Sequence, residues 1–187
     1  MTAIEHKPSP NFDARKDGKK PHILLLHYTG MKTAQDALDR LRHPESKVSC
    51  HYVIDEDGKI FSLVDESMRA WHAGIGYWRG ETDINSASIG IEMVNPGHEW
   101  GYRDFAKAQI DAVIALLKEI AARWSIPPQR ILAHSDIAPA RKADPGEKFP
   151  WKRLAEAVVE ELAGKAPVNV CVATYNTGEA VDLARHA

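Results

Sequence analysis

The apolar segment HILLLHY, residues 22–28, limits the possible folds of this chain more than any other feature. It follows Pro21 and is too short for a buried helix, whereas a short continuous apolar run is typical of a strand in the middle of a sheet. His27, near the end of this run, carries an imidazole that can bind a metal. We therefore expect a central strand with a functional side chain at its end.

Helical patterns surround this strand. Residues 33–43 begin with a capping-box pattern and then repeat apolar side chains at helical spacing. The longest stripe, over residues 105–126, continues for about five turns until two prolines follow. A last helix is expected over residues 150–164, from a proline to a glycine.

Short strand patterns alternate with these helices. Residues 48–54 and 59–64 flank an Asp-Gly turn, which predicts a hairpin. Residues 87–94 alternate, with Glu92 on the face opposite the larger apolar side chains. Residues 130–133 form a further short strand. This order of strands and helices predicts an α/β fold.

The chain has the size of one domain. Its 187 residues and hydrophobic content of 44% predict a single unit with its own core. Polar residues 1–20 predict an arm on the surface, residues 21–164 the domain itself, and residues 165–187 a tail without an assignable structure. Residues 70–85 contain many aromatics and glycines but no period, which indicates an ordered surface loop that carries binding residues.

The overall charge argues against some classes of partner. The formal net charge is -2, so no general field gathers nucleic acid or an anionic membrane. Residues 1–20 show neither a signal-peptide pattern nor an apolar run long enough to cross a membrane. Cys50 and Cys171 fit no metal or redox spacing, which favours a reducing compartment. These features predict a cytoplasmic protein, or a periplasmic one if a signal sequence was removed.

Two of the nine histidines have a context that favours metal binding. His27 and His134 each end a short apolar strand, so both can project at the same end of one sheet. The loop AHSDIAPARKADPG, residues 133–146, supplies Asp136 and Asp144 as candidate third ligands, and its prolines predict an extended course without regular structure. Two histidines and one carboxylate leave one position of a zinc ion for water.

The spacing leaves both aspartates open. His134 and Asp136 form an H-x-D pattern like that of iron oxygenases with two histidines and one carboxylate, and those enzymes need a further histidine downstream. Only His186, in the unassigned tail, lies downstream. This weakens the case for Asp136, and with Asp144 as ligand the set resembles a hydrolytic zinc site.

Two more charged residues are candidates for catalysis. Lys142 lies two positions before Asp144, on the same side of an extended segment, where its ammonium group can stabilise an oxyanion. The alternative for Lys142 is a solvated surface charge. Glu92 is the candidate base that takes a proton from metal-bound water, and its alternative role is a structural ion pair with an arginine.

Several motifs in a fixed order resemble the amidase type 2 family of zinc-dependent N-acetylmuramoyl-L-alanine amidases, which is related to the peptidoglycan recognition proteins. These motifs are HILLLHYTG, VSCHYVID, AWHAG, WRGETDINSASIGIE, AHSDIAPARKADPG and FPW. The resemblance implies a single domain with a central mixed sheet flanked by helices, in agreement with the order of elements above. Asp144 and Cys50 make the chain similar to the bacterial subgroups AmpD and AmiD.

The resemblance also implies roles for individual residues. It makes His27, His134 and Asp144 the ligands of one Zn²⁺ ion. Glu92 matches the general base of the family, and Lys142 matches the lysine beside the oxyanion. The groove that binds the muropeptide is implied to contain Trp71, His72 and Asn85, together with Trp78 and Arg79, while His51 matches a histidine with a structural role.

The activity implied by the resemblance is hydrolysis of the amide bond between the lactyl group of (anhydro-)N-acetylmuramic acid and L-alanine of the stem peptide. The partners are then muropeptides, in peptidoglycan recycling or turnover. The alternative is a recognition module that binds muropeptides without cleaving them, as some relatives do after losing a ligand. AmpD acts in the cytoplasm and AmiD in the envelope behind an export signal. The motif WRGETDIN resembles the envelope subgroup, whereas the start of the chain favours the cytoplasm.

Overall fold

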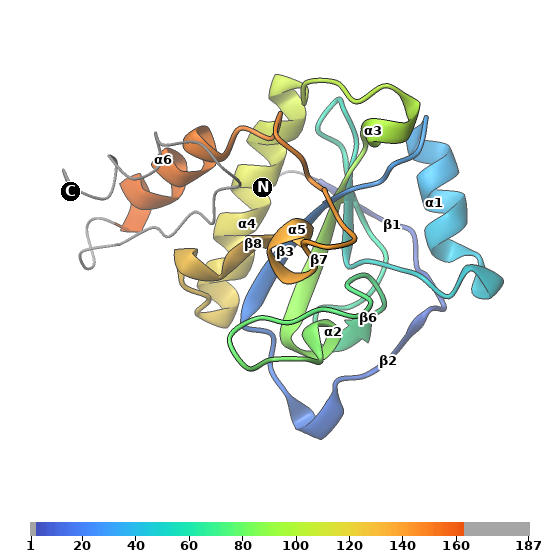
Figure 1. Cartoon of the computed structure of the whole chain (residues 1–187), viewed down its shortest axis with the longest axis vertical. Coiled ribbons are helices and arrows are strands. Elements are labelled where there is room, and N and C mark those ends of the chain that lie inside the picture. Colours follow the sequence, from blue (N-terminus) through green and yellow to red (C-terminus); the bar gives the residue numbers. More distant parts are fainter. Residues whose placement is uncertain (1–2, 163–187) are drawn as a thin grey trace.

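The computed structural model of this protein describes residues 3–162, with a mixed six-stranded sheet at its centre (Figure 1). The strands β4 and β5 are antiparallel and form the expected hairpin, while every other pair of neighbours in this sheet is parallel. The predicted central mixed sheet is therefore confirmed, and the tail over residues 165–187 lies outside the described residues. In sheet order the strands are β1 (Ile4–His6), β5 (Ile60–Ser62), β4 (Tyr52–Ile54), β7 (Ser88–Met93), β3 (Ile23–Tyr28) and β8 (Ile131–Ala133).

Two long helices cover one face of the sheet. Helix α4 (Lys107–Trp124) runs behind the central strands in Figure 1, and α6 (Trp151–Leu162) packs beside it. Alternate residues of β3, Leu24 and Leu26, are fully buried in the same core cluster as Ile110 of α4. The helix ends where Ser125 adopts a left-handed conformation ahead of the two prolines.

The opposite face of the sheet is covered by short elements and loops. Helix α1 (Ala34–Arg42) is capped by the side chain of Thr33, which accepts a hydrogen bond from the backbone N–H of Asp36 at 3.1 Å. Its Leu38 and Leu41 pack on this face. The remaining connections include α2 (Ile84–Ala87), α3 (Gly97–Trp100) and the 3-10 turns η1 (Lys16–Gly18), η2 (Pro44–Ser46) and η3 (Pro128–Arg130).

The expected surface arm is wrong for residues 3–20. Strand β1 pairs with β5 at the edge of the main sheet, and β2 (Phe12–Ala14) pairs with β6 (Met68–Ala70) in a separate two-stranded sheet. Arg15 is buried and donates hydrogen bonds to the backbone carbonyls of Glu66, Asn85, Ser86 and Ser88. Burial lowers its pKa to about 10, so it stays charged at neutral pH. Those carbonyls compensate the burial of the charge.

The loop over residues 133–146 also differs from the expectation in its first part. Residues His134–Ile137 form one helical turn, α5, closed by a hydrogen bond from the N–H of Ala138 to the carbonyl of His134 at 3.1 Å. The prolines come only at positions 139 and 145, so the N–H groups of this first turn remain available. Within residues 3–162, no helix combines the length and the apolar character needed to cross a bilayer.

Candidate metal centre

The strand order brings His27 and His134 to the same end of the sheet. His27 lies near the end of β3, and its side chain points away from α4 because Leu24 and Leu26 take the other face. His134 directly follows β8, the parallel neighbour of β3. The expectation that both histidines project at one sheet end is confirmed.

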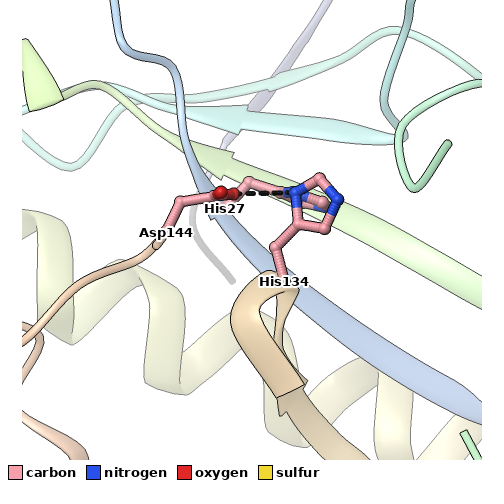
Figure 2. A group of neighbouring side chains, drawn as sticks. All are labelled: His27, His134 and Asp144. Atoms are coloured by element: carbon pink, nitrogen blue, oxygen red, sulfur yellow. Dashed lines mark hydrogen bonds and ion pairs between the residues drawn. The ribbon is translucent and has the colours of Figure 1, made fainter. Parts of the chain in front are cut away.

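Asp144 completes a buried group with the two histidines (Figure 2). Its Oδ2 atom lies 3.1 Å from Nδ1 of His27 and 2.9 Å from Nδ1 of His134, and the two Nδ1 atoms are 2.8 Å apart. Only 6% of Asp144, 1% of His27 and 2% of His134 is exposed to solvent. The three side chains come from β3, α5 and the loop that follows α5, and together they can hold a metal ion.

Asp136 lies outside this group. Its Oδ2 atom accepts a hydrogen bond from the backbone N–H of Ala133 at 2.8 Å and so closes the first turn of α5. Burial raises the pKa of Asp136 to about 6. The structure therefore favours Asp144 over Asp136 as the carboxylate of the centre, a choice that spacing in the sequence had left open.

The electrostatics of the three side chains fit a cation. Nε2 of His134 lies 2.9 Å from the carbonyl oxygen of Ala73, which can only accept, so this nitrogen carries the proton and Nδ1 of the neutral ring carries the lone pair. Burial, followed by the electrostatic effect of the adjacent His134 imidazole, lowers the pKa of His27 to about 4. Burial opposes ionisation of Asp144, but the close contacts with His134 and His27 hold its pKa well below the usual range. Two neutral imidazoles and one carboxylate are a typical donor set for zinc.

Glu92 lies on β7 directly opposite His27 in the register of the sheet. Burial, followed by the negative charge of Asp144, raises the pKa of Glu92 well above its usual value. Its Oε2 atom is buried and has no hydrogen-bond partner in the described part of the chain. The structural ion pair considered for Glu92 is not seen among these residues, and an unpartnered carboxyl oxygen is available to a ligand or a water molecule.

A cavity of about 690 Å³ opens onto the centre. Its lining includes the metal group, Glu92, Lys142, Trp71 and His72. Lys142 and Asp144 therefore face one cavity, as their spacing predicted. The neighbouring Arg141 is occupied differently, because its guanidinium donates to the backbone carbonyls of Ala73 and Ile75.

Three predicted substrate residues lie outside the lining of this cavity. Asn85 is buried, and its Oδ1 atom accepts hydrogen bonds from the backbone N–H groups of His72 and Ala73 at 3.1 and 2.8 Å. Trp78 packs against the core, and the guanidinium of Arg79 lies 5.4 Å from the centre of its ring. Contact of Trp78 and Arg79 with substrate stays a prediction.

His51 is fully buried under the site. Its Nδ1 atom accepts a hydrogen bond from the backbone N–H of Gly90 at 2.9 Å, and its Nε2 atom lies 3.1 Å from the carbonyl oxygen of Met68. Burial, followed by the charge of Arg15, lowers the pKa of His51 to about 3. This neutral, doubly bonded ring supports the structural role expected from the sequence.

A match to a known protein family extends over most of the described residues. The sequence pattern of amidase type 2, N-acetylmuramoyl-L-alanine amidase, matches residues 17–147. This chain belongs to the amidase type 2 family. The amidase AmiD of Escherichia coli (strain K12) is 38% identical over 190 residues, which cover 88% of this chain and 68% of AmiD. The 1,6-anhydro-N-acetylmuramyl-L-alanine amidase AmpD of Enterobacter cloacae is 32% identical over 171 residues, 82% of this chain and 89% of that one.

Solved structures of amidase type 2 proteins share the fold. A crystal structure of a selenomethionine derivative of AmpD superposes with a TM-score of 0.75 at 28% identity, covering 84% of this chain and 96% of that one. The complex of AmiD from E. coli with the substrate anhydro-N-acetylmuramic acid-L-Ala-D-gamma-Glu-L-Lys gives a TM-score of 0.68 at 36% identity, covering 92% and 73%. The predicted similarity to AmpD and AmiD is confirmed.

Two residues that support the site could not be recognised from the sequence. Ser88 opens β7 and contacts His72, while Arg141 binds the backbone beside it. Both residue types are common on surfaces, so their identity alone carries no signal. Their positions in the strand and in the loop after α5 become informative only when the fold brings them to residues 72–75.

Proposed function

We propose that this protein is a zinc-dependent N-acetylmuramoyl-L-alanine amidase. It cleaves the amide bond between the lactyl group of (anhydro-)N-acetylmuramic acid and L-alanine of the stem peptide, in peptidoglycan recycling or turnover. The observation that carries the proposal is the buried group of His27, His134 and Asp144 beside the unpartnered carboxyl of Glu92. The names of AmiD and AmpD, and the muropeptide bound to E. coli AmiD, support the substrate class.

The residues of the centre have separate tasks in this reaction. When bound by His27, His134 and Asp144, zinc supplies a Lewis acid for the carbonyl and lowers the pKa of water. Glu92 accepts a proton from the water that attacks the carbonyl carbon, and it then gives this proton to the leaving nitrogen of L-alanine. The raised pKa of Glu92 suits a group that must hold a proton between these steps. The products are a muramic acid lactate and a free peptide amine.

Lys142 stabilises the charge that develops on the carbonyl oxygen. Its side chain lines the same cavity as the metal group and Glu92, and its positive charge partly offsets the rise in the pKa of Glu92. A fixed positive charge at this place interacts more strongly with the developing oxyanion than with the neutral amide. Trp71 lines the same cavity and offers an aromatic face to the sugar or the peptide.

Hydrolysis of a defined anhydro-muropeptide tests the proposal. Mass spectrometry should show the free peptide after incubation with zinc-loaded protein, no product after chelation, and recovery when zinc is returned. Intact substrate together with measurable binding would instead support a muropeptide recognition module. A parallel incubation with polymeric peptidoglycan separates recycling of fragments from turnover of the wall. The cytoplasm as the compartment of this reaction stays a prediction.

A further inference from the structure

We propose that His72 is a positioning residue that fixes the tautomer of His27, and that the segment Trp71–Ala73 supports both histidines of the metal centre. The inference rests on the metal centre of the proposed function but not on its substrate. The observation behind it is a chain of short contacts. Nε2 of His27 lies 2.9 Å from Nδ1 of His72, and Nε2 of His72 lies 3.3 Å from Oγ of Ser88.

The backbone carbonyl of Ile84 determines the direction of each hydrogen bond in this series of contacts. Oγ of Ser88 lies 2.6 Å from the carbonyl oxygen of Ile84, which can only accept, so the hydroxyl donates its single proton there. The hydroxyl oxygen is then left as an acceptor for Nε2–H of His72. A neutral imidazole carries one N–H, and Nδ1 of His72 must therefore be an acceptor.

The tautomer of His72 determines the tautomer of His27. Because Nδ1 of His72 accepts, Nε2 of His27 is the protonated nitrogen and donates to it. The lone pair of His27 then lies on Nδ1, which faces His134 and Asp144. A hydrogen bond on the far side of a ligating imidazole is the usual way in which proteins select the coordinating nitrogen.

The ring of His72 is held in place by the strand beneath it. A Cβ atom added to Gly90 would lie 2.4 Å from the ring atoms Cγ and Nδ1 of His72, so the ring lies directly against the backbone of β7. The ring of His51 meets it edge-on, with 5.7 Å between the two centres. Glycine at position 90 is the residue that permits this close approach.

The same segment supports the other histidine. The carbonyl oxygen of Ala73 accepts from Nε2 of His134 at 2.9 Å, and Oδ1 of Asn85 holds the N–H groups of both His72 and Ala73. Asn85 thus acts on the centre through the backbone rather than by touching substrate. His72 lines the cavity, but both of its ring nitrogens are engaged within the protein, which leaves neither for a bound muropeptide.

Nuclear magnetic resonance of zinc-loaded protein with ¹⁵N-labelled histidines tests the direction of the hydrogen bonds. We expect a proton on Nε2 of His27, an unprotonated Nδ1 on His72, and a scalar coupling between these two nitrogens across the hydrogen bond. A proton on Nδ1 of His72, or no coupling between the two rings, would overturn the proposal. The measurement needs no substituted protein and no substrate, so it stands even if hydrolysis of muropeptides is not found.

Zinc affinity of matched variants tests the role. His72→Phe removes the acceptor and should raise the zinc dissociation constant roughly 10- to 100-fold. His72→Asn places an amide oxygen near the position of Nδ1 and should recover most of that affinity. A competing chromophoric chelator measures both constants, and thermal unfolding of the metal-free proteins checks their folds. Equal losses in the two variants, or no loss in His72→Phe, would refute the positioning role.

A serine pair extends the same test. Ser88→Ala removes the oxygen that orients His72 and should weaken zinc binding several-fold. Ser86→Ala is the matched control, because Ser86 is equally buried but its hydroxyl oxygen accepts from the backbone N–H of Lys16. Zinc affinity that falls equally in both serine variants would contradict the proposal, since the loss would then come from the packing around α2.

Discussion

Glu92 and His27 are aligned residues on the neighbouring parallel strands β7 and β3. Both point to the face of the sheet opposite α4, because Ile91 and Leu26 beside them are buried in the core on the α4 side. The distance between the proposed general base, Glu92, and the proposed metal ligand, His27, is therefore determined by strand register and not by a loop. This arrangement suits a site in which two groups must act on one water molecule.

Replacing Glu92 separates catalysis from metal binding. Glu92→Gln keeps the size of the side chain but cannot accept the proton, so turnover should fall by roughly 10²- to 10⁴-fold at unchanged zinc content. Peptide release by mass spectrometry and zinc by atomic emission give the two values. The control is Glu119→Gln on the exposed side of α4. Loss of zinc from Glu92→Gln would mean that Glu92 is a ligand.

The choice between the two aspartates can be tested directly. Asp144→Ala removes a ligand and should leave the purified protein with little zinc. Asp136→Ala should retain zinc and lose only the hydrogen bond to Ala133, which is worth about 1 kcal/mol of unfolding free energy. Metal analysis and urea unfolding measure these effects. The opposite pattern of metal loss would show that Asp136 is the ligand.

Lys142 should affect the rate more than substrate binding. Lys142→Met removes the charge beside the developing oxyanion, so kcat should fall by roughly 10²-fold with little change in KM. Lys152→Met, which changes an exposed lysine of α6, serves as the control. Steady-state hydrolysis of the anhydro-muropeptide gives both constants. A higher KM at unchanged kcat would assign Lys142 to binding of the ground state.

His51 should make the fold less stable in acid. Its pKa is about 3 in the folded protein and near 6.5 in the unfolded chain, so the unfolded chain binds the extra proton between these values. The free energy of unfolding should then fall by about 1.4 kcal/mol for each pH unit below 6.5 through this residue alone. Urea unfolding at pH 7 and pH 5 measures it.

The variant His51→Asn isolates this contribution. The asparagine keeps an acceptor for the N–H of Gly90 but does not titrate, so its unfolding free energy should depend less on pH by about 2 kcal/mol over that interval. The exposed residue His43 provides the control variant His43→Asn. Equal pH dependence in wild type and His51→Asn would show that His51 is not buried in its neutral form.

Periodicity was sufficient to predict the strand ends that carry the site. The apolar run before His27 and the alternation around Glu92 depend on burial of one strand face, which is a local property of the sequence. The third ligand was harder to predict. Asp136 and Asp144 are close in the sequence, and their tertiary contacts separate their roles: Asp136 accepts a hydrogen bond from the N–H of Ala133, whereas Asp144 contacts both histidines.

Other features of the fold could not be predicted from sequence patterns. Strands β1 and β2 have three residues each, too few for a period, and they pair with segments far along the chain. The burial of Arg15 contradicts the usual preference of arginine for solvent, and carbonyls from two distant segments, at Glu66 and at residues 85–88, make it possible. The support of His27 by His72 likewise depends on tertiary contacts alone.

The contacts of Arg15 also restrict when its segment can reach its native position. Its carbonyl partners follow it in the chain by 51 residues at Glu66 and by 73 residues at Ser88. During synthesis Arg15 therefore emerges before the carbonyl groups that bind it, and its segment can dock only after residues 66–88 have been made.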